Sequence, residues 1–296
     1  LNFNINLNTD EKYESKSMRR KLKVALIQFA PLSYEREQNL NKSLIFTQTA
    51  LEKGAKLVVL PELFDSGYCV EDKDFSYALS LEKELPSSLK ELAKKYEAYI
   101  IACSIEKEDD TLYDTAFIVG KEGLVGKYRK IYLFRDEKKR FARGQDYPVF
   151  ELVFKDFSLK LGLQICYEIG FGEGARFLAL QGAELICYPS AFGKARAYVW
   201  DLASRARALE SGAFVLAANR CGSEISKLSG ENLEFAGRSK IINPKGEILS
   251  ELSEKEGISY AVLDITQVKA QREYLTYLKD LDLDLSQKMY AKFNLS

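Results

Sequence analysis

The sequence predicts a layered α/β fold with mixed sheets, and three features of the 296-residue chain support this prediction. Short apolar runs that suit buried strands recur along most of the chain. Segments with the apolar spacing of helices follow some of these runs, and tight turns follow others. Strands that alternate with helices favour parallel pairing, whereas hairpins are antiparallel, so we expect sheets that contain both kinds of strand pair.

The predicted strands are short and mostly apolar on successive positions, as in KLVVL at 56–60. This pattern indicates strands that are covered on both faces. They comprise residues 23–30, 55–62, 99–106, 114–120, 124–130, 148–154, 159–167, 184–191, 214–221, 238–244, 246–252 and 259–265. The strands at 114–120 and 124–130 are separated only by Lys-Glu-Gly and are expected to form an antiparallel hairpin.

Helical spacing predicts helices over residues 36–53, 86–96, 173–182, 198–211 and 265–273. No low-complexity stretch or fixed short repeat divides the chain, so we expect one domain over residues 18–273. Residues 1–17 are polar and rich in asparagine, and we expect this extension to have little function. Residues 274–296 mix aromatic and charged side chains, which makes this tail a candidate for packing on a neighbouring subunit.

The composition excludes several classes of protein and site. Lys plus Arg and Asp plus Glu number 43 each, and no basic block is long enough to follow a nucleic-acid backbone. The longest apolar runs have about ten residues, which is far short of a membrane span. The chain has five cysteines without a Cys-x-x-Cys pair and no histidine, which argues against a disulfide framework and a zinc site. We therefore expect a soluble, cytoplasmic protein without a nucleic-acid partner, metal or cofactor.

One cysteine, Cys166, lies where the apolar run LGLQIC gives way to glycines and a predicted helix. A thiol at such a strand-to-helix junction is expected to be exposed at the sheet edge, with backbone N–H groups nearby to bind an oxyanion. The alternative is a buried structural cysteine, which residue type alone favours. Cys103 and Cys187 fall inside predicted strands and are expected to be structural.

Two other strand ends carry ionisable side chains. Glu62 follows the apolar strand KLVVLP, and Lys130 ends the strand LVGKYRK. A single charged residue at a strand end is most often a solvated surface group. A carboxylate, an ammonium group and a thiol that meet at one sheet edge would instead form a nucleophilic site, and the spacing alone leaves both alternatives open.

Six blocks in order resemble the nitrilase superfamily of carbon–nitrogen hydrolases, in its amidase and carbamoylase branch. The resemblance covers Lys21 to about Asp264. Its blocks are VALIQFAP, AKLVVLPELFDSGY, GKYRKIYLF, LGLQICYEIGF with ARFLALQGAELICYPSAF, SRARALESGAFVLAANRCG and AGRSKIINPKGEIL. The fold that the resemblance implies is an α-β-β-α sandwich that usually dimerises, and residues 175–185 and 206–214 correspond to helices of the common dimer interface.

The resemblance implies a Glu–Lys–Cys triad, in which a cysteine acts without histidine. Glu62 matches the general base of the family, Lys130 the lysine that stabilises the oxyanion, and Cys166 the nucleophile. Glu137 matches a second glutamate that supports the lysine and the substrate, although a surface charge in a Lys-rich loop is the alternative. The backbone N–H of Tyr167 is the expected second oxyanion donor.

The implied reaction is hydrolysis of a non-peptide amide bond through a cysteine thioester, with release of ammonia and without a cofactor. Lys130 and the junction geometry are expected to favour the thiolate form of Cys166, and Glu62 requires a raised pKa to alternate between base and acid. Relatives often carry a histidine two residues after the lysine, where this chain has Tyr132. That histidine is therefore dispensable or replaced here.

The sequence constrains specificity less strongly. Tyr68, Tyr167, Phe171 and Phe192 are candidate cleft residues beside the triad blocks, although core packing is the alternative for each. Relatives that hydrolyse N-carbamoyl amino acids carry arginines shortly after the nucleophile, where this chain has Gly170 and no arginine. Arg196 could nevertheless reach an anionic group. The expected substrate is a small linear amide or N-carbamoyl compound.

Two alternatives stay open. A nitrile is a less expected substrate, because nitrile hydrolases of the family usually carry tryptophan where this chain has Tyr167. The chain could instead be a catalytically silent binding or scaffolding subunit, but a scaffold has no chemical reason to keep all three triad residues. The expected partners are thus a small-molecule substrate, water, and further copies of the chain in a homodimer or larger homo-oligomer.

Overall fold

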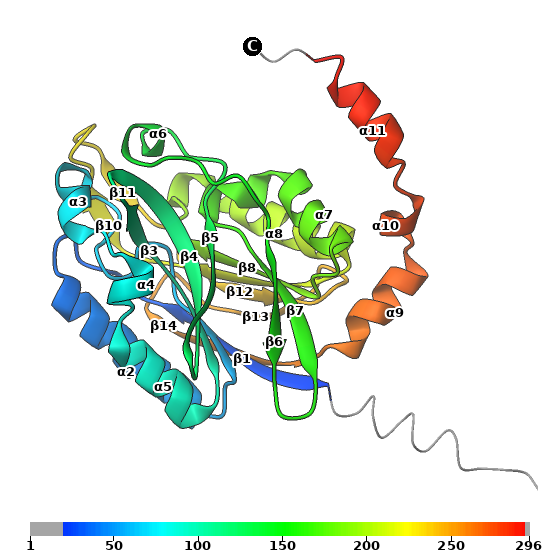
Figure 1. Cartoon of the computed structure of the whole chain (residues 1–296), viewed down its shortest axis with the longest axis horizontal. Helices are drawn as coiled ribbons and strands as arrows, with labels where there is room; N and C mark the ends of the chain where they lie inside the picture. Colours follow the sequence, from blue (N-terminus) through cyan, green and yellow to red (C-terminus); the bar gives the residue numbers. More distant parts are fainter. Residues whose placement is uncertain (1–19, 294–296) are drawn as a thin grey trace, which may run out of the picture.

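The computed structural model describes residues 20–293, which form two six-stranded sheets that face each other. A further pair of short strands forms a separate hairpin. Helices cover the outer face of each sheet, which gives four layers in the order helix, sheet, sheet, helix (Figure 1). The predicted α-β-β-α fold class is therefore confirmed. Residues 1–17, for which we expect little function, lie outside the described residues.

The first sheet has the strand order β14-β1-β2-β3-β4-β5. Its strands are β1 (Lys21–Gln28), β2 (Leu57–Val59), β3 (Tyr99–Glu108), β4 (Thr111–Gly120), β5 (Gly123–Arg129) and β14 (Gly257–Asp264). Strands β1, β2 and β3 are parallel, whereas β4, β5 and β14 pair in antiparallel fashion, which confirms the predicted hairpin. Helices α2 (Arg36–Glu52) and α5 (Ser87–Tyr96) connect the parallel strands and pack on the outer face.

The second sheet has the strand order β13-β12-β9-β8-β7-β6. Its strands are β6 (Val149–Val153), β7 (Ser158–Leu163), β8 (Leu185–Ser190), β9 (Phe214–Asn219), β12 (Lys240–Ile242) and β13 (Ile248–Glu251). Strands β7, β8 and β9 are parallel, and the others pair in antiparallel fashion. Helices α7 (Gly172–Leu180) and α8 (Ala197–Ser211) connect the parallel strands and cover the outer face.

Alternate side chains of one strand enter different cores, which explains the continuous apolar runs. In β1, Val24 and Leu26 pack between the two sheets, whereas Ala25 and Ile27 pack beneath the helices of the first sheet. All four side chains are fully buried. A strand covered on both faces requires apolar residues at every position instead of the period-two alternation of a half-exposed strand.

The predicted helices agree with the structure, but two strands that carry site residues end earlier than predicted. Strand β2 ends at Val59 and β7 ends at Leu163, so the chain leaves each sheet before it reaches Glu62 or Cys166. The apolar runs continue past the strands because the loops at this sheet edge are themselves buried. An apolar run therefore marks burial here and not the length of the strand.

Several elements of three to eight residues were not predicted, because a short segment shows no clear periodicity. They are η1 (Glu71–Lys73), α3 (Asp74–Tyr77), α4 (Leu81–Glu84), α6 (Glu137–Arg140), η2 (Cys166–Gly170), η3 (Lys194–Arg196), β10 (Ser223–Ile225), β11 (Asn232–Glu234), α10 (Tyr277–Asp280) and α11 (Leu283–Tyr290). The segment α9 (Thr266–Tyr274) matches the last predicted helix.

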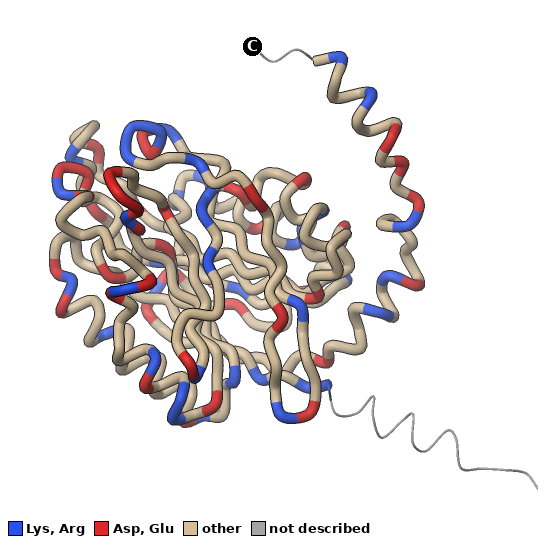
Figure 2. The backbone as a smooth tube through the Cα atoms, viewed as in Figure 1, with Lys and Arg blue, Asp and Glu red and all other residues tan. Residues whose placement is uncertain are grey.

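The C-terminal helices α9, α10 and α11 form an arc beside α7 and α8 (Figure 1). The hydroxyl of Tyr290 in α11 donates a hydrogen bond of 2.9 Å to Glu173 in α7. Along the described chain, basic and acidic side chains are interspersed (Figure 2), which fits the balanced composition. No helix within residues 20–293 combines the length and apolar character that crossing a membrane requires.

Candidate active site

The three predicted triad residues each follow the end of a strand. Glu62 lies shortly after β2, Lys130 directly follows β5, and Cys166 begins the short helix η2 after β7. Glu62 and Lys130 are fully buried, and Cys166 is 6% exposed. Solvation at the surface, which was the alternative for both charged residues, is therefore excluded.

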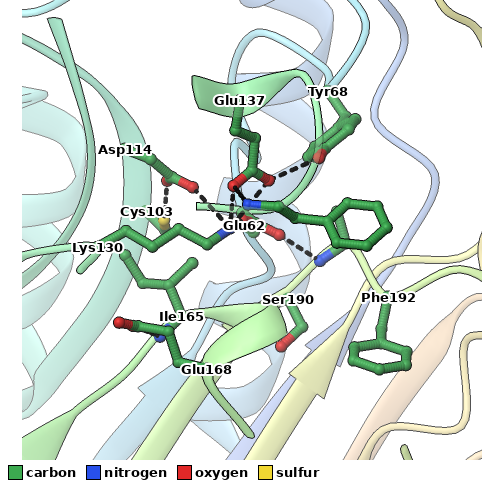
Figure 3. Close-up of polar contacts among 12 residues, drawn as sticks. Glu62, Tyr68, Cys103, Asp114, Lys130, Glu137, Ile165, Glu168, Ser190 and Phe192 are labelled. Carbon is green, nitrogen blue, oxygen red and sulfur yellow. Dashed lines mark hydrogen bonds and ion pairs between the residues drawn. The ribbon is translucent and has the colours of Figure 1, made fainter. Parts of the chain in front are cut away.

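The ammonium group of Lys130 contacts three carboxylates (Figure 3). Its Nζ atom lies 2.6 Å from Oε1 of Glu62, 2.9 Å from Oε1 of Glu137 and 3.2 Å from Oδ2 of Asp114. Glu137 thus belongs to this buried cluster and is not a surface charge of a Lys-rich loop. The short helix α6 turns Glu137 inward, while the next residue, Lys138, is exposed.

Both glutamates of the cluster are held at their two oxygens. Oε2 of Glu62 accepts the backbone N–H of Ala191 at 2.6 Å, while its other oxygen faces the ammonium group. Glu137 accepts the hydroxyl of Tyr68 at 2.6 Å and the backbone N–H of Phe134 at 2.7 Å. Fixed carboxylates of this kind are suited to proton transfer, because their lone pairs have defined directions.

Cys166 has a left-handed backbone conformation with a φ of 47°, which is uncommon for a residue with a side chain. Backbone strain of this kind is found preferentially at functional sites. The Ala191 N–H that donates to Glu62 also interacts with the Cys166 thiol, which places the thiol beside the carboxylate. The thiol is more buried than predicted: it lines a cavity and is not exposed at an open sheet edge.

The site favours a neutral thiol in the resting state. Burial raises the pKa of the Cys166 thiol well above its usual value, the charge of Glu62 raises it further, and Lys130 lowers it. Lys130 thus acts in the expected direction, towards the thiolate, but burial and the charge of Glu62 outweigh it. Burial also raises the pKa of Glu62 well above its usual value, despite the opposing charge of Lys130. Burial opposes the charge of Lys130, but Glu137, Glu62 and Asp114 raise its pKa, so it stays an ammonium group.

Glu168 is a buried residue at the site that the sequence analysis did not identify. Its Oε1 accepts hydrogen bonds from the Tyr128 hydroxyl and from the N–H groups of Ile131 and Tyr132, at 2.7, 2.9 and 3.1 Å. Its Oε2 accepts the N–H of Ile165 at 2.8 Å, and burial raises its pKa to about 7. This carboxyl ties the segment after the lysine to the turn of the cysteine. An acidic residue inside an otherwise apolar block was the signal for it.

Asp114 was also missed, because an acidic residue at the start of a predicted strand normally lies at the surface. Carboxylate oxygens of Glu62, Asp114 and Glu137 lie within 4.8 Å of one another, which is a grouping that could hold a cation. The ammonium group of Lys130 contacts all three, so a lysine takes the central position in this structure.

A cavity of about 390 Å³ lies beside Cys166, a volume that suits a small organic molecule. The predicted cleft residues Tyr68, Tyr167, Phe192 and Arg196 all line it. The guanidinium carbon of Arg196 lies 4.5 Å from the ring centre of Phe134, a further wall residue, and 5.9 Å from that of Phe192. Within residues 20–293, Arg196 forms no ion pair, so its charge is available to the cavity.

Phe171, in contrast, is not among the described residues that line this cavity. Its ring stacks on that of Tyr132, with ring centres 4.0 Å and planes 2° apart. Phe171 is half-buried, and its ring also contacts that of Tyr167, which lines the cavity, with ring centres 5.2 Å apart. The cavity lining also includes Leu233 and Phe235, which lie in and after β11. The sequence did not predict this hairpin because its strands have three residues each.

Several known proteins are similar to this chain in sequence or in fold. The family model for carbon–nitrogen hydrolases matches residues 23–273. A protein named nitrilase from Pyrococcus abyssi is 38% identical over 279 residues, which cover 92% of this chain and 100% of the relative. The omega-amidase NIT2 of Homo sapiens is 31% identical over 276 residues, which cover 89% of this chain and 96% of the relative.

A solved structure of an amidase from Nesterenkonia sp. AN1 superposes with a TM-score of 0.77 at 26% identity, and it covers 90% of this chain and 99% of that one. It is described as showing Michael addition of acrylamide at the active site cysteine of that amidase. The family match spans most of the chain, and the identity of 31–38% extends over nearly the full length of both relatives. The chain therefore belongs to the carbon–nitrogen hydrolases of the nitrilase superfamily.

Proposed function

We propose that this carbon–nitrogen hydrolase is a thiol amidohydrolase that uses Cys166 as nucleophile, Glu62 as general acid and base, and Lys130 as oxyanion donor. The observation that carries the proposal is the buried contact of 2.6 Å between Lys130 and Glu62, next to a strained cysteine that lines a cavity. Strain at a buried thiol is costly for a residue that only packs the core.

In the first step the thiol proton of Cys166 moves to Glu62 while the sulfur attacks the carbonyl carbon of the substrate. Proton transfer accompanies the attack, because the raised pKa of the thiol disfavours a resting thiolate. The negative charge that develops on the carbonyl oxygen is stabilised by Lys130 and by the backbone N–H of Tyr167. One such donor typically lowers the barrier by about 3–4 kcal/mol.

In the second step Glu62 returns its proton to the leaving nitrogen, and ammonia departs as the carbon–nitrogen bond breaks. The acyl group stays on Cys166 as a thioester. Glu62 then removes a proton from water, whose oxygen attacks the thioester carbon. As the carbon–sulfur bond breaks, Glu62 returns this proton to the sulfur, which releases the acid and restores the Cys166 thiol. Burial supports this alternation between base and acid, because it raises the pKa of Glu62 above its usual value.

A small linear amide or N-carbamoyl compound is the substrate class that we infer. The cavity of about 390 Å³ suits a short chain, and its lining contains aromatic side chains and both acidic and basic residues. Arg196 is the lining group that we propose binds an anionic end of the substrate, because it forms no ion pair among the described residues. Similarity to an omega-amidase and to a bacterial amidase supports an amide. A nitrile is the competing substrate class, because another relative is named nitrilase.

Ammonia release from a panel of amides, N-carbamoyl compounds and nitriles tests this proposal. Cys166→Ala should lower the rate by a factor on the order of a thousand or more, because no other group there forms a thioester. Cys187→Ala is the matched control, since Cys187 is equally buried in β8 but lies away from the cavity lining. Full activity of Cys166→Ala would exclude the proposed nucleophile. Silence of the folded wild-type protein on all three classes would favour the scaffold alternative.

We also propose that copies of the chain associate through α7 and α8, and that the protein works in the cytoplasm. Large apolar side chains are exposed on these helices: Phe177, Leu180, Tyr198 and Leu202 are 38–67% exposed. Apolar groups that gather on one face are typical of an interface. All five cysteines are free, which suits a reducing compartment.

A further inference from the structure

The buried cluster around Lys130 has more acidic than basic groups. Glu62, Asp114 and Glu137 are at most 2% exposed, and each contacts the same ammonium group. Three ionised carboxylates and one ammonium group would give a net charge of −2 (three negative charges, one positive). Among the described residues no second cation contacts these carboxylates. Burying that much uncompensated charge is costly, so the cluster is expected to hold an additional proton.

The hydrogen bonds indicate which carboxyl is least stabilised as an anion. Glu137 accepts the ammonium group, the Tyr68 hydroxyl and a backbone N–H. Glu62 accepts the ammonium group at 2.6 Å and a backbone N–H at 2.6 Å. Among the described residues, the donors to the Asp114 carboxyl are the ammonium group in its longest contact, at 3.2 Å, and the thiol of Cys103 at 3.2 Å. A thiol is a weak donor, so Asp114 is the carboxylate that its surroundings stabilise least.

We propose that Asp114 and Glu62 share one proton in the resting site, and that Asp114 is a positioning residue that sets the charge state of the proposed base. Both carboxyls contact Lys130, and their oxygens lie within 4.8 Å of each other. One shared proton reduces the net charge of the cluster to −1. The inference rests on the proposed function only where it treats Glu62 as the base.

The shared proton matters for the attack step. When Cys166 loses its proton to Glu62, the sulfur forms a bond to the carbonyl carbon and the negative charge moves to the carbonyl oxygen. The two carboxyls then hold one proton each, and together with Lys130 and Glu137 the cluster is neutral. The site therefore gains an oxyanion beside Lys130 only as the carboxyl cluster loses its own excess negative charge.

The electrostatics of Glu62 agree with this assignment. Burial is the main cause of its raised pKa, and the charge of Asp114 and a hydrogen bond from its side chain raise it further. The titratable groups that face Glu62 come from several elements. They are Tyr68, Cys103, Asp114, Lys130, Glu137 and Cys166. The charge of Lys130 lowers the pKa of Glu62, whereas the charges of Asp114 and Glu137 raise it.

Infrared difference spectroscopy tests the shared proton without any substrate. The wild-type spectrum at neutral pH minus that of Asp114→Asn should show a lost carboxylic-acid band, because asparagine keeps the shape but carries no acid proton. Other buried carboxyls, such as Glu168, cancel in the difference. Loss of carboxylate bands alone would overturn the proposal, since it would mean that the cluster is fully ionised.

Two control variants calibrate the measurement. Glu106→Gln removes a buried carboxylate that Arg129 and Lys127 hold at 2.6–2.9 Å and whose pKa is lowered, so it should lose carboxylate bands only. Cys103→Ala removes the thiol beside Asp114 but keeps both carboxyls, and should retain the acid band. Loss of the acid band in Cys103→Ala would assign the proton to the thiol contact and overturn the proposal.

Kinetics test the positioning role separately. Asp114→Val leaves Lys130 with one acceptor fewer and should lower kcat on the order of tenfold to a hundredfold. Asp114→Asn should keep most of the activity that Asp114→Val loses. The fall in its rate at acidic pH, the acid limb of the pH–rate profile, should occur at the same pH as in the wild type. A shift of that limb to lower pH in Asp114→Asn, or full activity of Asp114→Val, would overturn the role of Asp114. A protein that gives the acid band but releases no ammonia would contradict the proposed function alone.

Discussion

Replacement of Lys130 by methionine removes the buried positive charge but keeps an unbranched side chain of similar length. The wild-type ammonium group lies 2.6, 2.9 and 3.2 Å from three carboxylates, and none of the lysine is exposed. Removing one partner of a buried ion pair typically costs about 3–5 kcal/mol, because the remaining charge is left without compensation. We expect the free energy of unfolding of Lys130→Met to fall by about this amount at pH 8.

This loss should shrink as the pH falls. Burial raises the pKa of Glu62 in the folded state above its unfolded value, so folding favours the protonated form. Stability from such a group is fully present below the unfolded pKa and is lost as the pH rises through the folded pKa. The charge of Lys130 lowers the pKa of Glu62, so its removal raises that pKa further and extends the window of stability to higher pH. Lys130→Met should therefore be most destabilised at alkaline pH and least at about pH 5.

Urea unfolding at a series of pH values, followed by the fluorescence of the buried Trp200, measures this effect. Lys194→Met is the matched control, because Lys194 forms an ion pair of similar length, 2.7 Å, with Glu254 at the surface. The control should change stability far less and without the same pH dependence. Equal losses in the two variants, or a loss in Lys130→Met that does not vary with pH, would refute the reasoning.

Three further predictions concern the cavity and the surface. Tyr68→Phe removes the hydroxyl that donates to Glu137 and should lower kcat for ammonia release about tenfold, whereas an unchanged kcat would show that this hydrogen bond is not needed. Arg196→Met should raise KM about tenfold for an amide with a carboxylate end but much less for a neutral amide of equal length. Steady-state kinetics with the two amides measures this difference, and an equal rise in KM for both would contradict an anion-binding role of Arg196. Leu202→Glu places a charge on the exposed apolar face of α8 and should convert the oligomer to monomers in light scattering. An oligomer of wild-type mass would place the interface elsewhere.

Pattern and length decide which elements the sequence predicts. The 17 residues of α2 show enough turns for helical spacing to be recognised, and the doubly buried β1 shows an apolar run that half-exposed strands lack. Strands β10 and β11, with three residues each, offer no such pattern, although they bring Leu233 and Phe235 to the cavity wall. The ends of β2 and β7 were misjudged because buried loops continue their apolar composition.

The site shows a second limit of prediction from sequence, which concerns residues that are distant in the chain. Glu62 and Lys130 are 68 residues apart in the chain and come within 2.6 Å only because two strands end at the same edge. Motif blocks shared with a family identify such residues, whereas spacing does not. Asp114 lies outside these blocks. Its proposed role follows from the three carboxylates that surround one ammonium group, which only the structure shows. The sequence also does not show how deeply Cys166 is buried beside Glu62, and these two effects outweigh the influence of Lys130 on the thiol pKa.

The identity of the cysteine that carries the acyl group during turnover tests the central claim most directly. The wild-type protein is mixed with an amide that it hydrolyses, quenched in acid and digested, and the peptides are mapped by mass spectrometry. The account predicts the acyl mass on the peptide that contains Cys166, its absence from those with Cys103 and Cys187, and its loss on treatment with hydroxylamine. An acyl group on another cysteine, or turnover by Cys166→Ala, would contradict it.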